Sequence, residues 1–134
     1  MGKITNIEGI GEENKKKLAN AGIKTTEDLL NKGATAKGRK GIEDLTGVGH
    51  KSVLKWTNMA DLFRVKGLGE EYTELLEAAG VDTVKELALR KPENLHKKIL
   101  EVNEAKKLVR RPPSVDMVSK WVAEAKVLPR VVKY

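Results

Sequence analysis

The sequence predicts an all-α protein that contains an internal repeat. Apolar residues recur at the three- and four-residue spacing of a helix in several segments, whereas the two-residue alternation of a strand occurs only in short stretches. The same residue types also recur along the chain at a nearly constant distance, which indicates a duplicated unit. We therefore expect helices throughout and no sheet.

Two matched segments define the repeat. Gly9 is followed 58 positions later by Gly67, and Trp56 is followed 65 positions later by Trp121. The second copy must therefore have gained about seven residues between the two matches. The predicted organisation is a first repeat over 1–64, a second over 65–128 and a tail over 129–134, with the two repeats packed as one domain. The tail contains Pro129 and is expected to be either an extended strap or disordered.

Glutamate pairs mark the start of the first helix in each repeat. The pairs at 12–13 and 70–71 each follow a glycine directly, and carboxylates in a first turn stabilise the positive end of a helix. The same helices are expected to stop at Gly22 and Gly80, because glycine is common just past a helix end.

Threonines mark the start of the second helix. Thr25 with Asp28, and Thr83 with Glu86, have the spacing of a capping box. Glu86 is the better partner of the two acidic residues, because glutamate and glutamine are usual in that motif. New helices are therefore predicted to begin at these two threonines.

The third and fourth helices follow in the same order. Thr35 is suited to cap a third helix through Leu45, and glycines at 33, 38 and 41 lower the helix propensity of this segment. Pro92 is suited to open the counterpart of this helix, through about Val102. The fourth helix carries apolar residues at i, i+3, i+7 and i+10, which form one stripe facing the core. The two stripes are Val53, Trp56, Ala60 and Phe63, and Val118, Trp121, Ala125 and Leu128.

A tripeptide of glycine, an apolar residue and glycine occurs three times, each time before a predicted helix. Two glycines allow a sharp turn between helices, and a buried middle residue anchors that turn in the core. The amides that follow point outward at the positive end of a helix, which is a ready site for an anion. The tripeptides are Gly9-Ile10-Gly11, Gly47-Val48-Gly49 and Gly67-Leu68-Gly69.

With these tripeptides the sequence resembles the helix-hairpin-helix superfamily, whose hairpins bind the phosphates of DNA without reading its sequence. The resemblance covers both halves and implies a duplicated helix-hairpin-helix (SAM-like) bundle. The whole chain is also similar to an uncharacterised prokaryotic family of tandem helix-hairpin-helix-like domains, through the segments 56–62, 67–72 and 102–109. That family implies no particular activity.

The second tripeptide is the best candidate for binding phosphate. The glutamates after the first and third tripeptides would repel an anion, so residues 9–11 and 67–69 are assigned a structural role. Basic or neutral residues follow the second tripeptide instead. The candidate residues in this segment are Gly47, Val48, Gly49, His50, Lys51 and Lys55.

The place where the repeat predicts a fourth hairpin has a different sequence, running from Val109 through two arginines and two prolines to Ser114. It lacks both glycines, and proline has no amide to donate. Any phosphate contact in this segment must therefore come from side chains. The candidates are Lys106, Lys107, Arg110 and Arg111.

The charge of the chain favours an acidic partner, with nucleic acid first. There are 26 lysines and arginines against 19 acidic residues, for a net charge of +7. The excess lies in segments 37–55 and 97–111, which add Lys37, Arg39 and Lys40 to the candidates. A pseudo-twofold axis between the two halves would join these segments into one basic face.

Several classes of site are excluded or disfavoured. The absence of cysteine excludes a disulfide framework, a thiolate zinc site and a cysteine nucleophile. His50 and His96 lack the spacing of a metal pair, and no catalytic motif is present, so we expect no metal, cofactor or catalytic residue. Trp56 and Trp121 are expected in the core, and Tyr72 at its edge.

The sequence therefore predicts a non-catalytic, sequence-independent binder of nucleic acid, with duplex DNA favoured, located in the cytoplasm and not in a membrane. One alternative is a protein-interaction or scaffold module that docks a partner through the acidic hairpins or the loop at 112–113. Another is an accessory domain of a nuclease or polymerase. The choice of DNA or RNA, the oligomeric state, and binding of a monovalent cation by hairpin carbonyls stay open.

Overall fold

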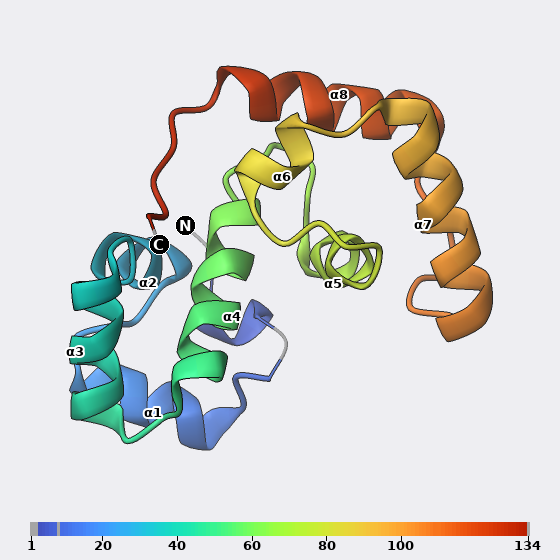
Figure 1. Cartoon of the computed structure of the whole chain (residues 1–134). Coiled ribbons are helices and arrows are strands. Elements are labelled where there is room, and N and C mark those ends of the chain that lie inside the picture. Colours follow the sequence, from blue (N-terminus) through green and yellow to red (C-terminus); the bar gives the residue numbers. More distant parts are fainter. Residues whose placement is uncertain (1–2, 8, 134) are drawn as a thin grey trace. The chain divides into compact units, whose positions relative to one another are not determined.

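A computed structural model describes residues 3–7 and 9–133 (Figure 1). These residues form eight α-helices and one 3-10 helix and contain no strand, as the sequence predicts. By internal contacts the chain divides into two compact units. One comprises Met1–Asp61 with Arg130–Tyr134, and the other comprises Leu62–Pro129.

The first unit contains the 3-10 helix and four α-helices. Its apolar core gathers the isoleucines of the N-terminal segment, the leucines of the first two helices and the stripe of α4, where Val53 and Trp56 are buried. The elements are η1 (Ile4–Asn6), α1 (Glu12–Asn20), α2 (Thr26–Lys32), α3 (Ala36–Thr46) and α4 (His50–Leu62), whose last residue belongs to the second unit.

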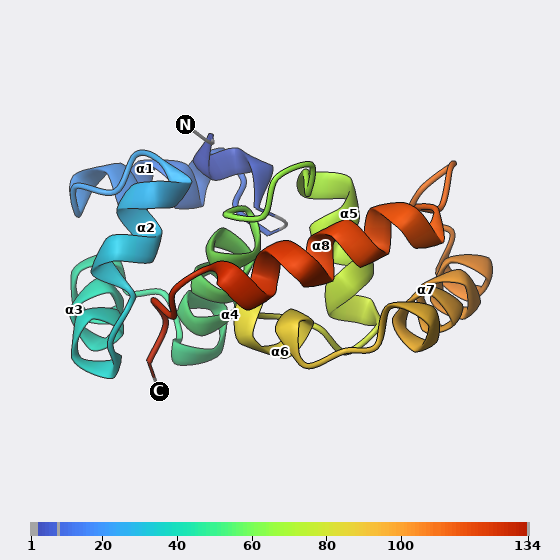
Figure 2. The same cartoon turned by 90° about the horizontal axis from the view of Figure 1, so that it is seen from above.

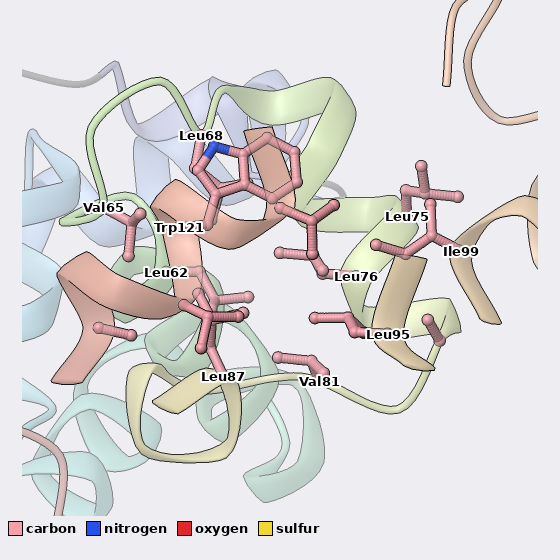
Figure 3. Packing of buried hydrophobic residues seen from close by; sticks show 14 of the residues in the cluster. Leu62, Val65, Leu68, Leu75, Leu76, Val81, Leu87, Leu95, Ile99 and Trp121 are labelled. Atoms are coloured by element: carbon pink, nitrogen blue, oxygen red, sulfur yellow. The ribbon is translucent and has the colours of Figure 1, made fainter. Parts of the chain in front are cut away.

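The second unit contains the other four α-helices around its own core. Helix α8 contacts α6 and α7 (Figure 2), and the buried Trp121 belongs to the apolar cluster that includes Leu68 and the leucines of α5 and α7 (Figure 3). The predicted stripe is confirmed for Val118, Trp121 and Ala125, which are buried, whereas Leu128 is half-buried and lies just after the end of α8. The elements are α5 (Glu70–Ala78), α6 (Val84–Ala88), α7 (Pro92–Lys106) and α8 (Val115–Val127).

Similar contacts join the ends of the first two helices in each unit, from donors at matching positions to acceptors that differ by one position. The Lys32 ammonium donates to the Ala21 carbonyl at 2.9 Å, and the Arg90 guanidinium donates to the Gly80 carbonyl at 3.0 Å. Each bond ties the end of a unit's second helix to the end of its first, where carbonyls lack helical partners. Gly22 and Gly80 have positive φ angles of +82° and +93°, which confirms them as helix stops.

The predicted caps form, but the complete capping box is at Thr25 and not at Thr83. The Thr25 hydroxyl accepts from the Asp28 N–H at 3.1 Å, and the Asp28 carboxylate accepts from the Thr25 N–H at 3.2 Å. Thr83 accepts from the Glu86 N–H at 3.1 Å, but the Glu86 carboxylate lies 3.9 Å from Arg90. The preference for Glu86 was therefore wrong, because its longer side chain reaches along the helix to a cation.

The cap of α2 makes the stability of the first unit depend on pH. The Lys24 N–H donates to the Asp28 carboxylate and lowers the pKa of that group below its ordinary value of 3.8, assisted by Thr25 and by the charge of Lys32. A carboxylate with a lowered pKa contributes stability above 3.8 that is lost as the pH falls through the folded-state value.

We expect Asp28→Asn to lower the midpoint of urea unfolding at pH 7 and to lower it less at pH 3, because below 3.8 part of the stabilisation by the Asp28 charge is already lost. Far-UV circular dichroism at both pH values measures the difference. An equal loss at both pH values would show that the charge of Asp28 does not stabilise the cap.

The tail is an extended strap in the first unit. The Lys133 N–H donates to the Ala34 carbonyl at 2.7 Å, and Val132 is buried. The C-terminal segment therefore completes the unit formed by the N-terminal half, although 65–128 lies between them in the sequence.

Candidate nucleic-acid interface

The bend between α3 and α4 is exposed in the first unit (Figure 1). Gly47 caps α3 with a φ angle of +74°, and its N–H donates to the Glu43 carbonyl at 2.8 Å. Gly49 precedes α4, and a Cβ added to either glycine would meet no atom within 4 Å. A ligand can therefore approach the backbone of the bend closely.

The first turn of α4 offers N–H groups beside a lysine. The Val53 N–H donates to the Gly49 carbonyl at 3.1 Å, so the N–H groups of His50, Lys51 and Ser52 lie before the first helical bond. No acidic residue occupies this turn, and Lys51 is exposed. Among the predicted hairpins, this helix start has the arrangement best suited to an anion.

The apolar anchoring of this bend differs from the prediction. Ile10 and Leu68, the middle residues of the first and third tripeptides, are each only 4% exposed, whereas Val48 is half-buried. Leu45, which precedes the second tripeptide, is 73% exposed. The expected burial was therefore wrong for this tripeptide, whose backbone is held by the α3 cap and by the Thr46 hydroxyl, which accepts from the Val48 N–H at 3.2 Å.

Two carboxylates of α3 lie near basic side chains of the candidate surface. Glu43 Oε2 is 3.2 Å from His50 Nδ1, and Asp44 Oδ1 is 3.4 Å from Lys40 Nζ. The Lys40–Asp44 pair is exposed on both sides, at 71% and 65%, and such surface pairs contribute at most about 1 kcal/mol, so a phosphate can compete for Lys40. The Glu43 side chain is only 16% exposed and lies beside the 67% exposed His50 ring. The other exposed lysines of the segment are Lys37, Lys51 and Lys55.

Arg39 does not belong to the candidate surface. It is 3% exposed, and its guanidinium donates to the Gly33 carbonyl at 2.8 Å and to the Lys133 carbonyl at 2.9 Å. The sequence-based assignment of Arg39 as a phosphate ligand is therefore corrected. Its charge serves to join α3 to the preceding loop and to the tail.

We expect Arg39→Ala to lower the free energy of unfolding by about 2 kcal/mol, because two carbonyls lose a charged donor. Its affinity for duplex DNA, measured by fluorescence anisotropy at a temperature where the variant is folded, should equal that of the unchanged protein. A loss of affinity for duplex DNA without a loss of stability would show that Arg39 contacts DNA.

The first and third hairpins are turns with acidic helix starts, as predicted. Gly9 and Gly67 have φ angles of +94° and +79°, which favour glycine. Glu12, Glu13 and Glu71 are exposed in the first turns that follow. Carboxylates at these positions oppose an incoming phosphate.

In the second unit, the C-terminal end of α7 presents two lysines. Lys106 is the last helical residue, and Lys107 caps the helix in the left-handed conformation with a φ angle of +52°. The Asn103 side chain donates to the Val109 carbonyl at 3.1 Å and accepts from the Val109 N–H at 3.0 Å. These two hydrogen bonds to the Val109 backbone fix the chain just before the two arginines.

Arg110 and Arg111 follow Val109 and are both exposed. The loop then continues to the buried Pro113, whose carbonyl lies 3.0 Å from His96 Nε2, and to Ser114, whose hydroxyl accepts from the N–H of Met117 at 3.2 Å. The loop at 107–114 is therefore held at both ends while its arginines face solvent. The structure brings Lys106, Lys107, Arg110 and Arg111 into one short segment.

Sequence reasoning missed a cavity beside these arginines. It has a volume of about 490 Å³, and residues at the start of α5 form one side of it. Tyr72 was predicted only as a core-edge residue, although Asn14 at the matching position of the first repeat was a signal that the two copies differ there. The lining residues are Glu71, Tyr72, Leu108, Val109, Arg110 and Arg111.

Two features are absent from the described part of the chain. Among the side chains that the structure describes, which leave out Glu70, no group of three or more histidine and acidic residues is arranged to hold a metal ion. Among the same residues, no helix combines the length and the apolar character needed to span a membrane.

Comparison with known protein families assigns the chain to a family. No significant match was found among curated proteins or among solved structures. The family described as Domain of unknown function (DUF4332) matches residues 8–128. Because the match covers most of the sequence and includes both predicted repeats, the chain belongs to this family.

Proposed function

We propose that this protein is a non-catalytic, sequence-independent binder of nucleic acid, with duplex DNA as the favoured ligand. The observation that carries the proposal is the exposed 47–49 bend, which leads into a helix start with a lysine and no acidic residue. The matching helix start in α1 carries two glutamates. This contrast favours one specialised anion site in the first unit.

We further propose that each repeat is a helix-hairpin-helix (SAM-like) unit. The positive φ angles of Gly9, Gly47 and Gly67, each followed by a helix, support this assignment. Such a hairpin offers backbone amides to a phosphate and leaves the bases unread.

In the proposed mechanism, amides of His50 and Lys51 bind phosphate in the first unit, with the side chains of Lys51 and Lys55 on the same helix as cations. Lys37 lies at the other end of α3 from the bend and is assigned only to the general positive charge of the segment. Arg110 and Arg111, with Lys106 and Lys107, bind phosphate in the second unit through side chains alone. No element of either segment is suited to enter a groove and read base edges, so binding is independent of sequence. The protein acts by binding nucleic acid and catalyses no reaction.

Salt dependence tests the proposal. If about four phosphates are neutralised, the logarithm of the affinity should fall with the logarithm of salt concentration at a slope of roughly −3 to −4. Anisotropy titrations of the full chain with two unrelated duplexes should give the same slope and the same affinity. A slope near zero, or affinities that differ tenfold between the duplexes, would contradict the proposal. Parallel titrations with RNA and single-stranded probes establish the ligand class.

A protein-interaction module is the second candidate. Leu45, 73% exposed directly before the bend, favours it, because an apolar side chain gains little from a phosphate backbone and much from a protein surface. In that case, Leu45→Lys would abolish capture of the partner and would leave or raise affinity for DNA. Nucleic-acid binding predicts no loss from this substitution.

A further inference from the structure

The cavity in the second unit has the size and lining of a small ligand site. Its volume of about 490 Å³ lies within the range of roughly 300 to 1,000 Å³ that is usual for such sites. Two arginines, a glutamate and a tyrosine ring share it with the apolar side chains of Leu108 and Val109. Charged, aromatic and apolar groups thus converge in one place.

The cavity arises where the two repeats differ. In the first unit only Val48 lies between the α3 cap and the residue that precedes α4, whereas residues 108–113 lie between the α7 cap and Ser114. The longer loop supplies four of the lining residues, and Tyr72 replaces the Asn14 of the first repeat. The open cavity therefore depends on residues of the second copy that have no counterpart in the first.

The ring of Tyr72 packs against the buried ring of Trp121. Its centroid lies 5.2 Å from the ring of Trp121, with a 50° angle between the ring planes, and Trp121 is only 3% exposed. Tyr72 itself is half-buried. A ring fixed by a buried partner loses little freedom when a second flat group stacks on it.

The charges around the cavity select the kind of ligand. Arg110 and Arg111 attract phosphate, whereas the Glu71 carboxylate opposes a free anion and accepts hydrogen bonds from amino groups. A nucleotide within a strand offers a flat base with hydrogen-bonding edges, and a phosphate links its sugar to each neighbouring sugar. It suits this combination better than an isolated phosphate or a purely apolar group does.

We propose that this cavity takes one unpaired base of the bound nucleic acid, stacked on Tyr72, while Arg110 and Arg111 bind the adjoining phosphates. The inference rests on the proposed function, since it assigns a preferred form to the same ligand. That form is a duplex with an unpaired nucleotide, as at a bulge or a gap. Stacking on an aromatic side chain tolerates any base.

Three DNA duplexes of identical paired sequence, each closed at both ends by a linker that contains no nucleotide, test the inference in anisotropy titrations of the full chain. One is fully paired, one carries a single bulged adenosine, and one carries a bulged abasic nucleotide with the same backbone flexibility but no base. We expect the adenosine bulge to bind roughly tenfold more tightly than the abasic bulge. Tyr72→Leu should remove that difference and leave affinity for the paired probe unchanged, whereas Tyr72→Phe should keep it.

Each other outcome is informative. Equal affinity for the adenosine and abasic bulges, with clear binding of the paired probe, overturns the base site and leaves the proposed function intact. A preference for adenosine that survives Tyr72→Leu in a folded protein, as judged by far-UV circular dichroism, also overturns it. Absence of binding to all three probes overturns the proposed function and the base site together.

Discussion

Changing Arg110 and Arg111 together to glutamate is expected to weaken binding of fully paired duplex DNA by roughly 30-fold or more at about 0.15 M salt. Each phosphate contact contributes about 0.9 to the salt slope, so loss of two contacts should also make that slope shallower by about 2. The charge reversal adds repulsion to this loss. Anisotropy titrations at four salt concentrations measure both quantities.

The fold should survive this double change. Both arginines are exposed, while the loop that carries them is held by Asn103 on Val109 and by His96 beside Pro113. Thermal unfolding should therefore shift little. A loss of affinity without a loss of stability assigns the two side chains to the interface.

A matched control separates local contact from overall charge. Lys16→Glu with Lys85→Glu changes the net charge by the same amount at exposed positions of α1 and α6, outside both candidate segments. We expect this control to lose only a few-fold in affinity through long-range attraction. Equal losses in the two double variants would show that the segment at 106–111 has no special contact with DNA, which favours the protein-interaction module.

Local signals predicted most of the helices because capping is a local property. Thr25, Thr35 and Thr83 each begin a helix by accepting from an N–H three residues on, and Pro92 begins another. The glycines in α3 weaken its propensity but do not prevent it, because Ile42 is buried in the core of the first unit. Packing of one apolar side chain there offsets a poor helix-forming sequence.

The wrong assignment of Arg39 and the missed cavity both came from contacts between residues that are distant in sequence. Arg39 resembles its basic neighbours in the sequence, but the tail returns to it, and the Lys133 carbonyl becomes its partner. Similarly, the cavity joins Tyr72 to a loop more than thirty positions later, so no local pattern reveals it. A run of basic residues in the sequence therefore does not show which of them are exposed, and Arg39 is the one predicted phosphate ligand that the structure buries.

Gly38 and Gly41 lie in the same helix, α3, and should respond in opposite directions to replacement by alanine. A Cβ added to Gly38 would overlap the backbone carbonyl oxygen of Lys32 and lie 3.3 Å from the Thr35 hydroxyl. Lys32 is the last residue of α2, so this oxygen cannot move without disturbing the junction between the two helices. At Gly41 an added Cβ meets nothing within 4 Å.

We therefore expect Gly38→Ala to lower the free energy of unfolding by about 3 kcal/mol, at the upper end of the cost of overpacking. Gly41→Ala should raise it by up to about 1 kcal/mol, because alanine is the better helix former. Urea unfolding followed by far-UV circular dichroism measures both changes against the unchanged protein. Because the two variants add the same methyl group to the same helix, their difference reports the close approach of α2 and α3. Equal effects would mean that α2 and α3 do not lie this close together in the folded protein. The placement of α3, and of the 47–49 bend that follows it, would then be contradicted.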